Sequence, residues 1–183
     1  SQTGIAIAES CLSVMEKFGA QHFCAIVTDN AANETSSWDP VRESYPDIVC
    51  TGCAAHSGSL LYKDIFEHQW AQNFLSEATT LAKFVKSHTW THQELKRLTK
   101  LKGKQMSITL HAETRFAGSY YTMKRLLEVS ESVKMMVVTD AFEEKKYDKQ
   151  AEIQRLCQCG SFWTELTKLV HFMRPLKNFI KLM

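Results

Sequence analysis

The sequence predicts an α/β segment over about residues 1–68 and an all-helical segment over residues 69–183. In the first part, two short apolar runs rich in β-branched residues alternate with helical patterns, which is typical of parallel α/β architecture. After His56 the apolar residues take the spacing of long helices, with almost no strand signal. We therefore expect two domains of different class in one chain.

Four elements are predicted in the first part before residue 52. A helix is predicted by apolar residues on one helical face, with Gly19 as its C-cap: Ile7, Cys11, Val14, Met15 and Phe18. Residues 22–28 (HFCAIVT) and 48–51 (IVCT) are predicted strands, and the first has the pattern of a strand buried on both faces. The helical stretch between them is expected to end before Pro40, because proline disfavours the helical conformation of its predecessor.

The second part is predicted to contain helices throughout. Apolar spacing marks helices at about residues 60–65, 74–85 and 95–101, and another from Thr114 to Val133. The run EEKKYDK, which contains Asp148, is expected to form a solvated turn. A last helix carries Leu166 to Leu176, and Pro175 is expected to kink it.

The composition is that of a folded globular protein, since 44% of residues are hydrophobic and 23% are charged. With 22 Lys and Arg against 20 Asp and Glu, the overall charge is too balanced to attract nucleic acid or membrane, so any polyanion site must be local. No segment reads as a membrane span or signal peptide, and we expect an intracellular protein with no membrane partner. The six cysteines are then expected to be reduced thiols or metal ligands.

Asp29 is the first candidate functional residue. It lies where the first predicted strand ends and the polar loop DNAAN begins, which is where α/β proteins present reactive side chains. A carboxylate there can bind a divalent metal. Equally, Asp29 or Asn30 can cap the next helix, and the spacing alone leaves both interpretations open.

Two cysteines and a histidine at three-residue intervals lie at the end of the second strand, and this pattern suits zinc. They are Cys50, Cys53 and His56, and a fourth ligand would have to come from Cys157, Cys159 or His111. The alternative is that Cys50 is a small buried side chain in an apolar strand. A nucleophilic cysteine is disfavoured, because no neighbouring base or charge marks a depressed thiol pKa.

A basic stretch is the third candidate. Trp90 precedes a run of five positive charges within nine residues. These charges are Lys96, Arg97, Lys100, Lys102 and Lys104. Such charges can follow a phosphate backbone, with an affinity that falls steeply with salt. The alternative is a solvated helix face without a ligand.

Three motifs in a fixed order resemble a known family: VTDNAAN (27–33), YPDIVCTGCAAHSGSLLYKDI (45–65) and TRFAGSYY (114–121). Together they resemble the hobo-Activator (hAT) transposases, and in particular a transposase-like domain of unknown function. The resemblance covers nearly the whole chain. The chain begins without an initiator Met and ends on an apolar run, so we expect it to be part of a longer protein.

The resemblance implies an RNase H-like core in which two Asp and one Glu hold two divalent metals, Mg²⁺ or Mn²⁺. Asp29 matches the second of these aspartates, and Cys53 and His56 match the family's Cys-x-x-His signature. Arg115 and Phe116 match a Thr-Arg-Trp motif in which Phe replaces Trp. The family's remaining Asp and Glu have no counterpart in this chain.

The parent activity implied by the resemblance is metal-dependent cleavage and transfer of DNA strands at transposon ends, in the nucleus, by a protein that can form homo-oligomers. Asp29 would be a metal ligand, His56 would assist near the scissile phosphate, and Arg115 would position active-site or DNA groups. This chain alone is expected to be inactive and to bind no metal. The alternative is a domesticated DNA- or protein-binding module without catalysis, in which Lys96, Arg97 and Lys100 hold DNA.

Overall fold

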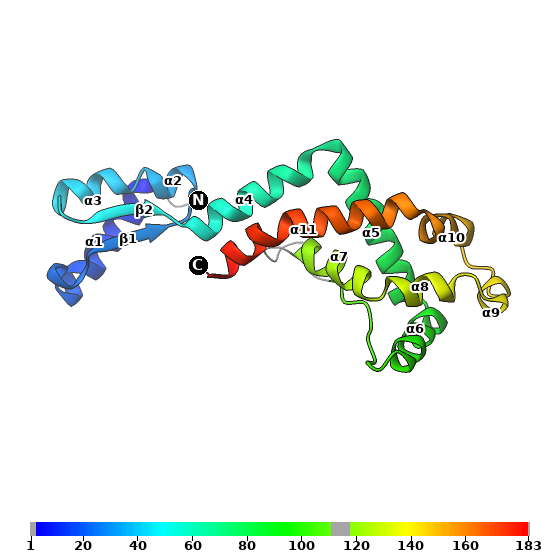
Figure 1. Ribbon diagram of the computed structural model, residues 1–183. Coiled ribbons are helices and arrows are strands. Elements are labelled where there is room, and N and C mark those ends of the chain that lie inside the picture. The colour runs from blue at the N-terminus through cyan, green and yellow to red at the C-terminus, as the bar shows by residue number, and fades with distance from the viewer. Residues whose placement is uncertain (1–2, 111–117, 183) are drawn as a thin grey trace. The chain divides into compact units, whose positions relative to one another are not determined.

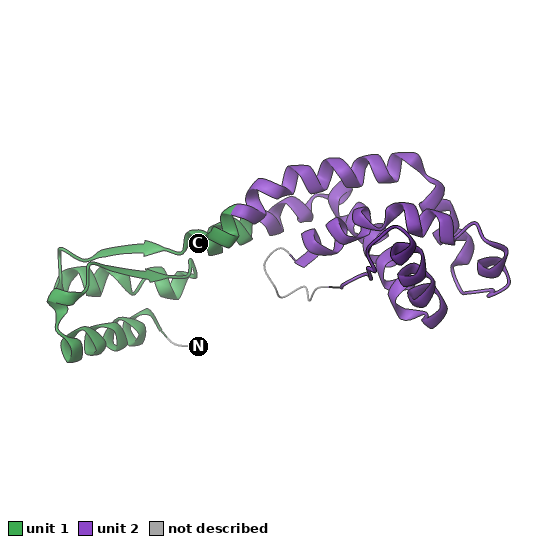
Figure 2. Ribbon diagram, turned by 60° about the horizontal axis from the view of Figure 1, so that its bottom comes forward, with its two compact units in different colours: residues 1–61, 179–183 green, residues 62–178 purple. Residues whose placement is uncertain are grey.

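A computed structural model describes residues 3–110 and 118–182 of the chain (Figure 1). The chain forms two compact units (Figure 2). Unit 1 contains residues 1–61 and 179–183, and unit 2 contains residues 62–178. Helices α4 (Ala54–Glu67) and α11 (Gly160–Leu182) each contribute residues to both units.

Unit 1 is built around two short parallel strands, which pair from Ala25 opposite Val49 to Thr28 opposite Gly52. Its elements are α1 (Gly4–Phe18), a 3-10 turn (Ala20–His22), β1 (Ala25–Thr28), α2 (Ala32–Thr35), α3 (Trp38–Ser44), β2 (Val49–Gly52) and the first turns of α4. The chain therefore combines helices with a parallel sheet, as predicted for an α/β protein. The first strand begins three residues later than predicted, because residues 20–22 form the 3-10 turn.

The core of unit 1 lies on one face of the strand pair, where α1 and α3 pack. Its buried members come from both helices, from β2 and from the residue before it: Ala8, Met15, Val41, Ile48 and Cys50. Two side chains of α3 bind the strands directly. The indole Nε1 of Trp38 donates to Thr28 Oγ1 at 3.1 Å, and Arg42 donates to the carbonyl oxygen of Cys50 at 3.0 Å. These bonds fix α3 against the sheet.

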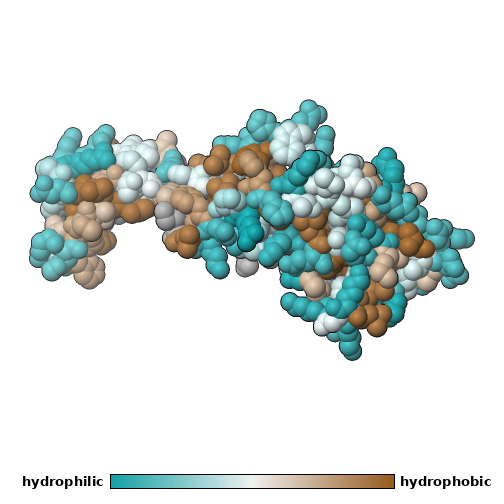
Figure 3. Space-filling model, viewed as in Figure 1, coloured by the Kyte–Doolittle hydropathy of each residue, from teal (hydrophilic) through white to brown (hydrophobic). Residues whose placement is uncertain are grey.

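The opposite face of the strand pair is exposed. The side chains of Val27 and Val49 are 61% and 59% exposed, and apolar residues gather over the strands of this unit in Figure 3. The prediction that the first strand is buried on both faces is therefore wrong for this chain. Parallel sheets are usually covered on both faces, and the prediction rested on this tendency. The apolar run correctly predicted a strand, but it did not predict that one face of the strand would stay exposed.

The prediction that a helix ends before Pro40 is wrong. In the structure Pro40 lies in the first turn of α3. The first four amides of a helix have no partner within it, so the missing N–H of a proline costs nothing there. The break instead falls at Ser36 and Ser37, between α2 and α3.

Among its described residues unit 2 contains helices and no strand, as the sequence predicts, and residues 102–110 form a non-helical segment. Its further helices are α5 (Gln69–Ser87), α6 (Thr89–Leu101), α7 (Gly118–Glu128), α8 (Ser130–Met136), α9 (Asp140–Glu143) and α10 (Gln150–Gln158). The predicted helix from Thr114 to Val133 is interrupted at Val129, whose ψ of 4° leaves the helical range. Residues 114–117 lie outside the described part of the chain. Helix α10 was not predicted.

The run EEKKYDK is only partly solvated. The ring of Tyr147 packs 4.5 Å from the ring of His88 and 5.4 Å from that of Phe84, between centroids. Burial of this aromatic side chain, rather than solvation alone, therefore fixes the turn.

Pro175 lies inside α11, the last helix that the apolar spacing predicts. None of the described helices combines the length and apolar character that a membrane crossing requires.

The two faces of the strand pair should respond differently to substitution. Val27→Thr is expected to change the stability of unit 1 by less than about 0.5 kcal/mol, because the Val27 side chain is mostly in water. Met15→Ala is expected to cost roughly 2–5 kcal/mol, because it opens a cavity under the other face. Amide hydrogen exchange of β1 and β2 measures both effects, and equal losses would contradict the one-sided core.

Candidate functional site

The loops that follow β1 and β2 are joined by hydrogen bonds at the carboxyl ends of the two strands. The Cys53 amide donates to the Thr28 carbonyl at 2.7 Å, which extends the strand pairing one residue beyond β2. The side-chain amide of Asn30 donates to Ser57 Oγ at 2.7 Å. We call this place the carboxyl edge, and its residues are Asp29, Asn30, Cys53, His56 and Ser57.

Gly52 makes the contact between the loops possible. A Cβ built on Gly52 would overlap Oδ1 of Asn30, so no larger residue fits without displacing that side chain. The lack of a side chain at the last position of β2 thus lets the Asn30 side chain reach Ser57. A glycine near a strand end can mark such a close approach.

Asp29 follows β1 directly, and its carboxylate is engaged by its own loop. Oδ1 of Asp29 accepts a hydrogen bond from the Ala31 amide at 2.8 Å. Ala31 is the N-cap of α2, so Asp29 satisfies a backbone amide at the entry of that helix. This bond is an Asx-type turn within the loop, and the N-cap residue of α2 has no side-chain cap, so both the capping and the metal-binding interpretation of Asp29 stay predictions.

Cys53 and His56 lie on either side of the start of α4, which begins at Ala54. Both side chains are half-buried. The Ser57 amide donates to the Cys53 carbonyl at 3.0 Å, so Ser57, the neighbour of His56, is fixed both to this turn and to Asn30. The structure thus brings the predicted residues Asp29, Cys53 and His56 to one edge of the sheet.

The described residues do not complete a metal site. Within residues 3–110 and 118–182, no three side chains of His, Cys, Asp or Glu form a group that could hold a metal ion. A single carboxylate does not neutralise two divalent ions, so Asp29 needs further carboxylates for the chemistry that the resemblance implies. We therefore assign no metal-dependent step to this chain.

Two of the cysteines considered as zinc ligands are buried in the structure, and zinc binding itself stays a prediction. Cys50 is 6% exposed and packs in the core of unit 1, as the alternative interpretation predicted. Burial raises the pKa of the Cys157 thiol in unit 2 to about 12, which keeps it protonated. His111 lies outside the described residues, as do Thr114, Arg115 and Phe116, so their predicted roles stay predictions.

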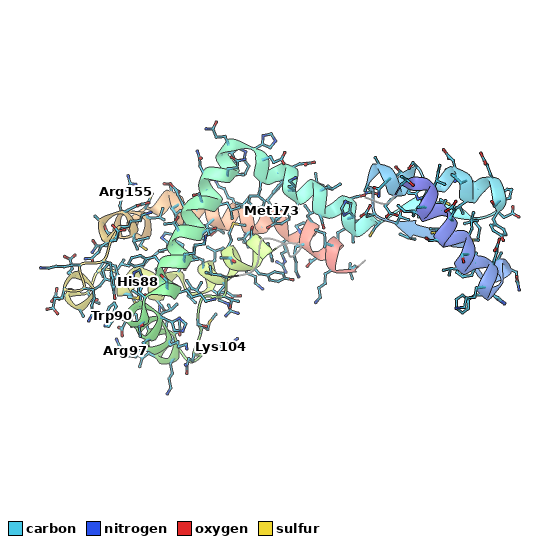
Figure 4. All side chains as sticks on the ribbon, turned by 180° about the vertical axis from the view of Figure 1, so that it is seen from behind. His88, Trp90, Arg97, Lys104, Arg155 and Met173 are labelled. Atoms are coloured by element: carbon cyan, nitrogen blue, oxygen red, sulfur yellow. The ribbon has the colours of Figure 1, made fainter. Side chains whose placement is uncertain are left out.

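The basic candidates lie on α6 and on the segment that follows it in unit 2, and they differ from one another. Figure 4 labels Arg97 on this helix and Lys104 on the segment that leaves it. Arg97 is bound through two nitrogens to the carboxylate of Glu94, at 2.8 and 2.6 Å. Lys96 is half-buried and Lys100 is exposed. The five charges are therefore not one uniform patch.

Sequence reasoning missed three residues that hold the carboxyl edge together: Asn30, its hydrogen-bond acceptor Ser57, and Gly52 at the end of β2. Asn30 was considered only as a helix cap. A glycine ending an otherwise β-rich run was the one signal that pointed to a close approach. The partner of Asn30 is 27 positions away along the chain, and a tether of that kind has no local signature.

Part of the chain is similar to a known family. Residues 1–81 match the model of a family described as a domain of unknown function (DUF659). The matched range contains β1, β2 and every residue of the carboxyl edge, and it ends within α5. No curated protein and no solved structure matches the chain significantly.

Gly52→Ala tests the close approach at the carboxyl edge. The added Cβ would overlap Asn30 Oδ1, and we expect a loss of roughly 1–3 kcal/mol in the stability of unit 1, as for other overpacked sites. Hydrogen exchange of the Cys53 amide would report the loss. Gly160→Ala is the matched control, because nothing lies within 4 Å of the Cβ position at Gly160.

The same substitution in an Asn30→Gly background should cost clearly less, because the overlapping atom is gone. A double-mutant cycle measures this coupling. If Gly52→Ala costs the same with and without the Asn30 side chain, the overlap is not what makes glycine necessary here.

Proposed function

We propose that unit 1 is a segment of a hAT-type transposase core with an RNase H-like fold, and that Asp29 and His56 belong to its active site. The observation that supports this proposal most is the carboxyl edge. Adjacent parallel strands present their following loops at the same edge, which is where α/β enzymes place reactive groups. Here that edge carries an Asp after one strand and a Cys-x-x-His sequence after the other.

The family match supports a transposase-related origin, since it spans the strands and the carboxyl edge together. On this proposal the intact parent cleaves and joins DNA at transposon ends in the nucleus, and can act as a homo-oligomer. Bound Mg²⁺ or Mn²⁺ would stabilise the attacking and leaving oxygens there. In this chain, the role of Asp29 is to offer one carboxylate, and that of His56 is to lie beside it.

A second candidate is a transposon-derived binding module without catalysis. It is favoured by the bond from the Ala31 amide to Asp29 Oδ1, because a carboxylate that only stabilises its own loop needs no metal. The two candidates differ in what Asp29 does when a divalent ion is present, and this difference can be measured on the chain itself.

Paramagnetic broadening by Mn²⁺ distinguishes the two candidates. If the carboxyl edge is part of a metal site, millimolar Mn²⁺ should broaden the NMR signals of Asp29 and Ala31 together with those of Cys53 and His56. Asp29→Asn should remove the broadening at all four residues, because the carboxylate supplies the charge that attracts the ion. Asp47→Asn, which changes a carboxylate outside the edge, is the control and should leave it intact.

Broadening that survives Asp29→Asn would favour the binding module, because the ion would then be attracted by other groups. That result would not touch the fold of unit 1, which the exchange experiment tests separately.

The isolated chain should not cut DNA. Because the chain offers one carboxylate at the carboxyl edge, we expect supercoiled plasmid incubated with the chain and Mg²⁺ or Mn²⁺ to stay intact. Asp29→Ala should make no difference to this result. Agarose gels of nicked and supercoiled forms measure this directly. Robust nicking that Asp29→Ala abolishes would show that other residues of the chain complete the site.

A further inference from the structure

Unit 2 contains a polar cavity of about 420 Å³, which is lined mainly by α5 and by the start of α7. This volume lies within the range of small-molecule sites, about 300–1,000 Å³. Five lining side chains carry a hydroxyl group, one is a lysine and none is a carboxylate: Ser76, Thr79, Thr80, Ser119, Thr122 and Lys83. A cavity of this composition suits a polar ligand with a negative charge.

One face of α5 supplies three of these hydroxyl groups. We call it the hydroxyl face, and its residues are Ser76, Thr79 and Thr80. Their spacing of three and four positions places them on one side of the helix. The opposite side is buried in unit 2 through apolar residues: Ala78, Leu81, Ala82 and Val85. The core therefore holds α5 in the orientation that turns the hydroxyl face to the cavity.

The hydroxyl groups of this face are free to bind a ligand. Serine and threonine in a helix commonly donate to a carbonyl one turn earlier, as Ser59 does to Ala55 at 2.9 Å. Within residues 3–110 and 118–182, the hydroxyl face makes no such bond and has no other side-chain partner. Each of its hydroxyl groups can therefore donate to a bound molecule without breaking a bond inside the protein.

Lys83 brings a positive charge to the same face, one turn after the two threonines. The positions three and four residues away on either side are not acidic, since they are Thr79, Thr80, Lys86 and Ser87. Across the described part of the chain, no Asp or Glu forms an ion pair with Lys83. Its ammonium group is thus available to an anion that enters the cavity.

We propose that this cavity binds the phosphate group of a small molecule. Lys83 would supply the counter-charge, and the hydroxyl face would donate hydrogen bonds to the phosphate oxygens. Leu75 and Leu110 also line the cavity and offer apolar contact to the organic part of a phosphate ester. The proposal is independent of the transposase proposal, because every lining residue lies in unit 2 and none belongs to the carboxyl edge.

Other ligand classes fit the cavity less well. A divalent cation would need carboxylate ligands and would be repelled by Lys83. A neutral ligand would leave the ammonium charge without a counter-charge. A nucleic-acid duplex is bound through many cations along its backbone, whereas the lining of this cavity contains Lys83 alone. A phosphate group offers three strong acceptor oxygens, which can be shared among the ammonium and hydroxyl donors.

A nuclear magnetic resonance titration of the isotope-labelled chain tests the proposal. Inorganic phosphate and glycerol 3-phosphate are added separately at constant ionic strength, and glycerol is the uncharged reference. We expect saturable shifts of the amide signals of residues 76–83 and of Ser119 with both phosphates and none with glycerol. Tighter binding of the ester would identify an organic phosphate as the source of the group, and tighter binding of inorganic phosphate would identify the free ion.

Two variants remove the proposed donors. Lys83→Gln should weaken phosphate binding by about tenfold or more, because a charge-assisted hydrogen bond is lost. Thr79→Val/Thr80→Val keeps the lysine and the side-chain shape, and it should weaken binding by about fivefold or more through the loss of two donors. Far-ultraviolet circular dichroism checks that both variants keep their helices.

Each variant has a matched control outside the cavity. Lys86→Gln removes the same charge from the same helix at an exposed position. Thr164→Val/Thr167→Val removes two hydroxyl groups from α11 that donate to the backbone of their own helix. Both controls should leave phosphate affinity within about twofold, as is usual for changes away from a site.

Four results would overturn the proposal. The first is the absence of saturable shifts at tens of millimolar of either phosphate. The second is an equal loss in Lys83→Gln and Lys86→Gln, since general charge attraction would then account for binding. Shifts of equal size with glycerol would show that the site does not select an anion. Displacement of phosphate from the cavity by a DNA duplex would show that the ligand is not a small molecule.

Discussion

The 2.7 Å hydrogen bond from the Cys53 amide to the Thr28 carbonyl decides where the loops of unit 1 meet. It extends the parallel pairing of β1 and β2 past the end of the second strand, so both strands end at the same level. Parallel pairing is what places an Asp that follows one strand beside a Cys-x-x-His sequence that follows the other; in an antiparallel pair the two would lie at opposite ends. Asn30 and Gly52 then bind the two loops together.

At the same edge, Asp29 has a structural contact that does not depend on a metal. Its Oδ1 accepts the Ala31 amide and so fixes the loop that leads into α2. Under the proposed function this carboxylate would also bind a metal, and loss of that second role would leave the loop intact. The proposed core and the proposed binding module therefore differ in chemistry and not in architecture.

The helices were predictable because their apolar residues recur at helical spacing, as those of α1 and α5 do. The sequence could not predict which side of the strands would be covered, since Val27 and Val49 look like core residues but are exposed. The predicted helix end before Pro40 was wrong because proline is equally suited to the first turn of a helix. At the candidate sites, Asp29 and His56 were found from local pattern, whereas the Asn30 to Ser57 contact joins distant positions. The Glu94 to Arg97 pair has ordinary helical spacing and could have been anticipated.

The register of the two strands is tested most directly by nuclear Overhauser contacts in the isotope-labelled chain. The account predicts contacts from the Cys53 amide to Thr28 and Asp29, and from the side-chain amide of Asn30 to Ser57, together with the parallel pairing of Ile26 and Cys50. Contacts that place the strands antiparallel, or an Asn30 side chain without any contact to the start of α4, would contradict it, because Asp29 and His56 would then have no common edge.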